Sequence, residues 1–235
     1  MSPGERDAAA LGSNAAAAIV GVAGTSLNAA ERALFSRARP AGFILFARNC
    51  SDSEQVTGLI RALRSSIDNA HAPVLIDQEG GRVARLKPPH WLALPPLRAL
   101  GELAERDLRA ASEAARLHAR LIASDLEPLG ITVNCSPVLD LGLPGQTEAI
   151  GDRAFSADPA VVSALGRATI EGYLAGGILP VIKHLPGHGR ATVDSHADLP
   201  CVAADGHTLG EADWLPFKAN AEAPLGMTAH ILFSE

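Results

Sequence analysis

The sequence has few aromatic residues, few cysteines and no excess of positive charge. Its formal net charge of −6 provides no basic surface, so nucleic acid is not an expected partner. The cysteines, Cys50, Cys135 and Cys201, lie far apart and form no CxxC motif. This spacing argues against a disulfide framework or a zinc site. It fits a reducing compartment, and we expect the protein in the cytoplasm.

Long apolar runs are also missing. No stretch reaches the roughly 18 apolar residues of a membrane-spanning helix, so we expect no membrane partner. Residues 15–24 have the composition of a signal-peptide core, but Glu5 and Asp7 precede them where a signal peptide is basic. We therefore interpret this segment as the start of a first strand.

Short apolar segments alternate with longer helical segments along the chain. Strands are predicted at residues 19–23, 42–46, 73–76, 131–138, 178–183 and 227–233. Helices are predicted at residues 29–37, 53–69, 103–126, 159–175 and 209–221, with Asn28 and Asp52 capping the first two. Strands that are apolar on both faces and alternate with helices form parallel sheets covered by helices.

Two architectures fit this pattern, a doubly wound sheet and a (β/α)8 barrel. The segment after the first strand, GVAGTS, lacks the G-x-G-x-x-G of dinucleotide-binding sheets. Polar residues follow the ends of four different strands, the face on which barrel enzymes build their sites. These residues are Asp77, Asp140, Lys183, His184 and His230. We predict an α/β fold, a TIM barrel with about six of its eight β/α units present, as a single incomplete domain over residues 1–235 without a second domain.

The third strand runs into the segment DQEGGRVAR at residues 77–85. Gly80 and Gly81 allow a sharp turn and a close approach of the backbone to a ligand. Asp77 can accept hydrogen bonds from adjacent sugar hydroxyls, while Arg82 and Arg85 can donate in return or pair with the carboxylates. Taken alone, the segment fits a strand-end turn with surface ion pairs equally well.

A second motif, IGDRAF at residues 150–155, places Arg153 after a Gly-Asp turn. From there the guanidinium can reach the mouth of a barrel. For this motif alone, an ordinary loop arginine is the simpler interpretation.

The fifth strand ends in Lys183 and His184 and opens into a loop that contains three further protonatable groups. Neighbouring residues of a strand point to opposite faces, yet at a strand end both can reach one pocket. His188 lies between two glycines and is interpreted as structural. Asp194 can accept the Nδ1–H of His196, fix its tautomer and raise its pKa, so that it serves as acid and base. The alternative is a surface Asp-Ser-His turn.

Other chemistries are less well supported by this loop. His184, His188 and His196 with Asp194 offer zinc ligands, but Pro-Gly between the first two histidines excludes the helical spacing of such sites. A hydrolase that uses Ser195 would need a G-x-S-x-G turn, which the sequence lacks. We predict no metal and no organic cofactor.

Three motifs occur together and in order: DQEGGRV at residues 77–83, GDRAF at 151–155, and KHLPGHG at 183–189 followed by DSH at 194–196. This set resembles glycoside hydrolase family 3, and within it the bacterial β-N-acetylhexosaminidases of cell-wall recycling. The resemblance covers nearly the whole chain. Related β-glucosidases generally keep the Lys-His pair but lack the Asp-x-His dyad in this loop.

The resemblance implies a monomeric, retaining exo-β-N-acetylglucosaminidase that acts on a small carbohydrate through a covalent glycosyl-enzyme. The implied substrate is a muropeptide with N-acetylglucosamine on 1,6-anhydro-N-acetylmuramic acid. His196 would be the proton donor and acceptor, with Asp194 as its dyad partner. The implied contacts to the N-acetylglucosamine ring are Asp77, Arg85, Arg153, Lys183 and His184. A β-glucosidase or phosphorylase of the same family, or a non-catalytic sugar-binding partial barrel, remains an alternative.

A histidine in the acid/base role has a physical rationale. Retaining glycosidases usually pair two carboxylates, whereas a neutral imidazole avoids a second anion beside the developing glycosyl ester. Asp194 would stabilise the imidazolium once it takes a proton from water. The glycines between Gly187 and Asp194 suit a loop that closes over substrate.

The family's nucleophile is an aspartate in an (S/T)-D-D-L segment after the seventh strand, and this sequence has no such segment. Asp198 followed by Leu199 lies in the wrong loop for this role. We therefore expect a truncated barrel, and we expect the chain itself not to release the chromophore from a chromogenic N-acetyl-β-glucosaminide. A full-length family member serves as the positive control. Turnover by this chain above the blank would contradict the prediction.

Overall fold

The computed structural model describes residues 14–193 and 198–234. Within them, parallel strands form one sheet in the order β1-β2-β3-β4-β5-β7, which is also their order along the chain. The strands are β1 (Ala16–Val20), β2 (Pro40–Leu45), β3 (Val74–Ile76), β4 (Val133–Asn134), β5 (Leu179–Leu185) and β7 (Leu225–Thr228). A second, two-stranded sheet pairs β6 (Cys201–Val202) with β8 (Leu232–Phe233). The main sheet is the wall of a (β/α)8 barrel with six of its strands, as the sequence predicts.

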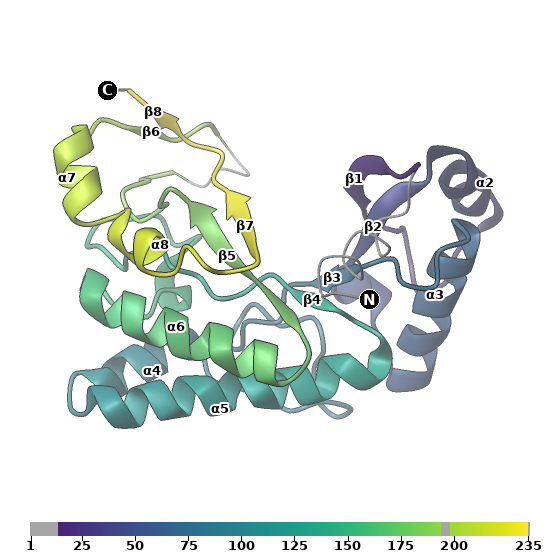
Figure 1. Cartoon of the computed structure of the whole chain (residues 1–235), viewed down its shortest axis with the longest axis horizontal. Coiled ribbons are helices and arrows are strands. Elements are labelled where there is room, and N and C mark those ends of the chain that lie inside the picture. The colour runs from purple at the N-terminus through teal and green to yellow at the C-terminus, as the bar shows by residue number, and fades with distance from the viewer. Residues whose placement is uncertain (1–13, 194–197, 235) are drawn as a thin grey trace.

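Helices connect successive strands and cover one face of the sheet. They are α2 (Ala29–Ala38), α3 (Ser53–Ser66), α4 (Leu97–Ala104), α5 (Leu108–Leu126), α6 (Pro159–Ala175), α7 (Gly206–Glu211) and α8 (Leu215–Ala219), with 3₁₀ turns η1 (Ala47–Asn49), η2 (Glu127–Leu129) and η3 (Gly151–Arg153). In Figure 1, α5 and α6 lie side by side below the sheet, with α2 and α3 at one end and α7 and α8 at the other. Over the described part of the chain, none of the helices is long and apolar enough to cross a bilayer.

The two faces of the sheet are filled by different residues, because successive side chains of a strand point to opposite faces. Phe43, Leu45, Val74 and Ile76 are fully buried and pack in the same apolar cluster as α3. A separate small cluster fills the other face, which is the barrel interior. Its members are Ile44, Leu75, Val133, Cys135, Val181 and Met227. Each strand from β2 to β5, together with β7, therefore contributes to an interior layer.

Two predicted helices are each divided in two in the structure. The predicted helix 103–126 breaks between α4 and α5, where Asp107 caps α5 by accepting a hydrogen bond from the Ala110 amide. The predicted helix 209–221 is α7 and α8, and Asp205 caps α7 through the Thr208 amide. Asp107 thus starts a new helix inside a continuous apolar pattern. The second break has a different cause, because α8 begins after Trp214 without a side-chain cap and with Pro216 in its first turn. The caps at Asn28 and Asp52 and the start of α6 are confirmed.

Strand boundaries differ most where the apolar signal is weak or interrupted. The first strand, predicted at 19–23, is β1, which begins three residues earlier in an alanine run that has little strand preference. The fourth, predicted at 131–138, is shortened to β4, and Pro137 in its second half has no N–H to donate. The sixth, predicted at 227–233, is β7 and β8, which belong to different sheets.

Two helical glycines give a matched test of the packing. A Cβ at Gly101 of α4 would overlap the carbonyl of Phe155, whereas a Cβ at Gly58 of α3 would meet nothing within 4 Å. We expect Gly101→Ala to lower the free energy of unfolding by about 1–3 kcal/mol through overpacking. Gly58→Ala should raise it by about 0.5–1 kcal/mol, because alanine is the better helix former. Urea denaturation of both variants checks this, and a Gly101→Ala protein as stable as the wild type would contradict it.

Candidate active site

The interior layer of the barrel continues into charged residues at the carboxyl ends of the strands. Asp77 lies two residues after Leu75, and Lys183 lies two residues after Val181. A spacing of two keeps each side chain on the same face as the apolar residue before it. The strands therefore deliver a carboxylate and an ammonium to the same end of the barrel interior, where barrel enzymes carry their sites.

Lys183 is the centre of this group. Its side chain is 1% exposed, and its Nζ lies 2.9 Å from Asp77 Oδ1 and 2.5 Å from Glu79 Oε1. Because β4 lies between β3 and β5 in the sheet, the lysine reaches over one strand to meet both carboxylates. Burial opposes the charged form, yet Glu79 and Asp77 together raise the pKa of Lys183 above its ordinary value. The lysine is therefore held as a buried cation.

Two arginines extend the chain of ion pairs at both ends. Arg153 forms a bidentate ion pair with Glu79. Its Nε donates to Oε2 and a terminal nitrogen donates to Oε1, both at 2.8 Å. Arg85 donates to Asp77 Oδ2 at 3.3 Å. Charges thus alternate along the series Arg153, Glu79, Lys183, Asp77 and Arg85. Four residues that the sequence predicts as sugar contacts, Asp77, Arg85, Arg153 and Lys183, form one connected network.

Glu79 is the member that sequence reasoning missed. It is 1% exposed and pairs with both Lys183 and Arg153. Burial raises its pKa, but these two cations outweigh that effect and lower it to about 2. The same competition leaves the pKa of Asp77 below its usual value, with Lys183 as the stronger of its two cationic neighbours. The available signal was position, since Glu79 stands two residues after Asp77.

The turn after β3 is fixed by amide hydrogen bonds. Gln78 Oε1 accepts from the backbone amides of Arg85 and Leu86 at 2.7 and 3.0 Å. Its own backbone exchanges two hydrogen bonds with the side chain of Asn134, at 2.9 and 2.8 Å. Gly80 and Gly81 have positive φ angles of 94° and 55°, which supports the expected sharp turn.

Arg82 connects this turn to the loop that carries Arg153. It pairs with Asp152 at 2.7 Å and donates to the carbonyls of residues 148, 149 and 150. The sequence offered two roles for Arg82, sugar contact and pairing with the carboxylates of its own segment, whereas in the structure it pairs with Asp152 of the neighbouring loop. Arg153 belongs to this loop and pairs with Glu79 of the turn, so the two arginines together hold the loop against the site.

Asp140, after β4, binds the end of β5. It is fully buried, and its Oδ2 lies 2.6 Å from His184 Nδ1. Its Oδ1 accepts from the backbone amides of His184 and His188 at 3.2 and 2.7 Å. Burial alone would raise the pKa of Asp140, but His184 and the two amides hold it below its ordinary value. His188 is buried and lies 5.8 Å from the His184 ring, in agreement with a structural role.

The first part of the loop after β5 is closely packed. A Cβ at Gly187 would lie 3.2 Å from Asp213, and one at Gly189 would lie 2.6 Å from the Leu141 carbonyl. Arg190 Nε pairs with the buried Asp213 at 2.8 Å, and the Ala191 carbonyl accepts from the Thr147 amide at 2.9 Å. The glycines were expected to let the loop move. In residues 187–191 they instead permit close contact with neighbouring loops.

The remaining candidate residues are either exposed or not among the residues that the structure describes. Asp194, Ser195 and His196 lie outside the described residues. His230 follows β7 and is exposed, as is Asp198. Within residues 14–193 and 198–234, no three His, Cys, Asp or Glu side chains gather so as to hold a metal ion.

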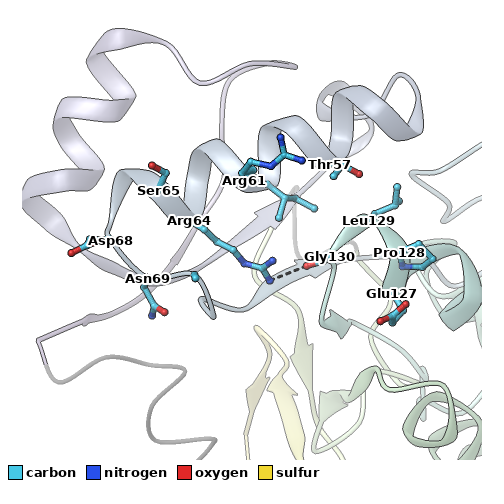
Figure 2. A pocket seen from close by; sticks show the side chains of 12 residues that line it. Thr57, Arg61, Arg64, Ser65, Asp68, Asn69, Glu127, Pro128, Leu129 and Gly130 are labelled. Carbon is cyan, nitrogen blue, oxygen red and sulfur yellow. Dashed lines mark hydrogen bonds between the residues drawn. The ribbon is translucent and has the colours of Figure 1, made fainter.

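A cavity of about 470 Å³ lies at the opposite end of the sheet, between the end of α3 and η2. Figure 2 shows Arg64 pointing into this region. Its guanidinium donates to the carbonyls of Ala72 and Gly130 at 3.0 and 2.9 Å, just before β3 and β4 begin. Arg64 thus braces the amino ends of two strands, the end where residues of barrel proteins serve stability.

Known proteins resemble this chain in sequence and in fold. The chain is 42% identical to a β-hexosaminidase of Xylella fastidiosa (strain M23) over 219 residues, 92% of the chain and 64% of that protein. NagZ from Neisseria gonorrhoeae, solved with N-trifluoroacetyl-D-glucosamine, superimposes with a TM-score of 0.87 at 31% identity, over 93% of this chain and 65% of that one. A glycoside hydrolase family 3 β-N-acetylglucosaminidase from Paenibacillus gives a TM-score of 0.83 at 32% identity, over 92% of this chain and 40% of that one.

The chain therefore spans about two thirds or less of the length of these relatives. The family model described as the glycosyl hydrolase family 3 N-terminal domain matches residues 14–235. With this match and the shared barrel, the chain belongs to glycosyl hydrolase family 3.

Proposed function

We propose that this chain carries the sugar-binding part of a retaining exo-β-N-acetylglucosaminidase. The observation that supports it is the alternating ion-pair network at the carboxyl ends of β3 and β5. Such a network holds several hydrogen-bonding groups in fixed positions before substrate arrives, which lowers the ordering cost of binding. The named activities of the relatives point in the same direction.

Arg85, Asp77 and Arg153 have the more accessible side chains of the network. The Asp77 side chain is 15% exposed and that of Arg85 is 25% exposed, while Lys183 and Glu79 are each 1% exposed. Each carboxylate oxygen of Asp77 has one cationic partner and retains lone-pair capacity for a sugar hydroxyl. We therefore assign Asp77 and Arg85 to direct sugar contacts, with Lys183 and Arg153 beside them.

His184 completes the sugar-binding set from the other side of the strand end. Its side chain is 18% exposed, and Asp140 takes up Nδ1. The second ring nitrogen, Nε2, is then the atom available to a hydroxyl of the sugar. In this proposal the sugar ring lies between the carboxylate of Asp77 and the imidazole of His184.

Proton transfer is assigned to His196 with Asp194 as its partner, on the strength of the sequence resemblance. His196 would protonate the leaving oxygen and then take a proton from the water that cleaves the glycosyl-enzyme. The loop stem that leads to His196 is anchored through Arg190 and Ala191, which gives this group a defined starting point.

We further propose a cytoplasmic role in cell-wall recycling, with terminal N-acetylglucosamine removed from muropeptides that end in 1,6-anhydro-N-acetylmuramic acid. A relative solved with N-trifluoroacetyl-D-glucosamine supports an N-acylated glucosamine as the sugar. No metal or organic cofactor enters this proposal. We propose that the chain acts as a single monomeric domain.

The first test is sugar binding by the 235-residue chain. We expect N-acetylglucosamine to bind with a dissociation constant in the millimolar range, roughly −4 kcal/mol, and more tightly than glucose. Arg85→Ala should weaken binding about tenfold by removing one charged donor. Titration followed by NMR or calorimetry provides the measurement.

Arg116→Ala is the matched control, because this arginine pairs only with exposed glutamates on α5 and α6 in the described part of the chain. Its affinity for the sugar should equal that of the wild type. Equal affinity for glucose and N-acetylglucosamine would favour a β-glucosidase instead. If neither sugar bound, the proposed site would be refuted.

The second test uses the buried charge of Glu79. Its pKa of about 2 in the folded protein lies below the ordinary 4.5, so its ionised form stabilises the fold above pH 4.5. That contribution, on the order of 3 kcal/mol, is lost as pH falls through this window. Glu79→Gln keeps the shape but removes the charge. We expect it to cost about 3–5 kcal/mol at neutral pH, since two buried cations lose a partner.

Urea denaturation between pH 2 and pH 7 measures both effects. The decrease in stability on acidification should be smaller in Glu79→Gln than in the wild type. Glu113→Gln, which alters an exposed carboxylate on α5, should reproduce the wild-type pH profile. An identical pH profile for Glu79→Gln and wild type would show that Glu79 is not the group responsible.

A further inference from the structure

We propose that Asp140 is a positioning residue that acts through His184 and His188. It would set the ring orientation of the sugar-binding histidine and, with the same carboxylate, fix the start of the loop that leads to the acid/base residue. This inference rests on the proposed function only for the role of His184 in sugar binding. The positioning itself rests on the geometry around Asp140.

The carboxylate is fully buried and all its described hydrogen bonds go to two residues of one segment. Oδ2 is hydrogen-bonded to the ring Nδ1 of His184 at 2.6 Å. Oδ1 accepts hydrogen bonds from the backbone amides of His184 and His188, four residues apart, at 3.2 and 2.7 Å. A surface ion pair would contact solvent, whereas the described hydrogen bonds of this group all go to the end of β5 and the start of the next loop.

Asp140 has a fixed position of its own because the two residues before it pair with β5. Just before it, the Leu139 amide donates to the Lys183 carbonyl at 2.8 Å, and Val138 bridges to Lys183 in parallel register. The carboxylate is therefore presented by backbone that is already paired with β5. An oriented acceptor on a rigid element is how proteins set a histidine ring.

An ionised carboxylate at Oδ2 accepts only from Nδ1–H, so it selects one tautomer of neutral His184. The proton is then on Nδ1, and Nε2 carries a lone pair that accepts a hydrogen bond from a sugar hydroxyl. Without the carboxylate, Nδ1–H would lose its partner and the ring could turn or change tautomer. Asp140 thereby decides whether His184 meets the sugar as an acceptor or as a donor.

The same carboxylate also ties two functional elements together. His184 belongs to the sugar site, while His188 begins the stem that continues through Arg190, paired with Asp213, and Ala191, bonded to Thr147. His188 contributes its amide here and not its ring. One buried group thus sets the relative placement of the sugar-binding histidine and the root of the catalytic loop.

Asp140→Asn separates the two tasks. The asparagine Oδ1 can still accept the amides of His184 and His188, but its NH2 group cannot accept Nδ1–H. We expect His184 to change to the Nε2–H tautomer, with Nδ1 accepting from the new amide. Two-bond ¹H–¹⁵N spectra of the histidine rings report the tautomer, and His184→Gln identifies the His184 signals by their loss.

Sugar affinity is the second readout. Asp140→Asn should weaken N-acetylglucosamine binding about tenfold, by turning an acceptor toward the hydroxyl into a donor. In the His184→Gln background the same substitution should have little further effect, because Asp140 acts through that ring. Asp158→Asn, a cap of α6 that asparagine also fills well, is the control for loss of one charge.

The two readouts have separate consequences. An unchanged His184 tautomer in Asp140→Asn overturns the positioning role, whatever the sugar does. A changed tautomer with unchanged affinity overturns the link from Asp140 to the sugar. Absence of sugar binding in the wild type overturns the proposed function, while the tautomer result still decides the positioning role.

Discussion

The buried ammonium of Lys183 is the group on which the rest of the site depends. It bridges Asp77 and Glu79 from the far side of β4 and is almost completely enclosed. Removing a charge from water costs several kcal/mol, and only close partners of opposite sign offset this cost. Each carboxylate in turn holds an arginine. Loss of the ammonium would leave two anions facing each other. The network is therefore stable only when all of its charges are present.

The elements around this series divide the work between them. The segment after β3, the strand β5 and the loop after β4 supply the charges, and residues of the same segments orient them. Arg82 and Arg153 hold residues 148–152 against the turn after β3. Asp140 holds the end of β5 and the root of the next loop. Orientation thus comes from Arg82 and Asp140, which are not among the proposed sugar contacts, and from Arg153, which is one of them.

Much of the fold and part of the site were predictable from the sequence. The strand and helix order follows from apolar runs that alternate with helical periodicity. The strand ends locate Asp77, Lys183 and His184 at the same end of the barrel. Short strands were harder, because β4 owes its limits to Pro137 and to pairing partners distant in the chain. The network position of Glu79 and the contacts of Asp140 to His184 and His188 were missed, since a carboxylate gives no local sign of the cation or amide that it meets after folding. Asp140 was noted for its position, but not for its partners.

The network also has a cost that concerns how the chain reaches its native state. Lys183 and Asp77 are 106 residues apart in sequence, and Arg153 and Glu79 are 74 apart. Closing loops of this length loses chain entropy before any contact compensates for it, and contacts of high sequence separation slow folding. Helical turns and neighbouring strand pairs need no such closure. The charges of this network are therefore expected to assemble late, after the scaffold that carries them.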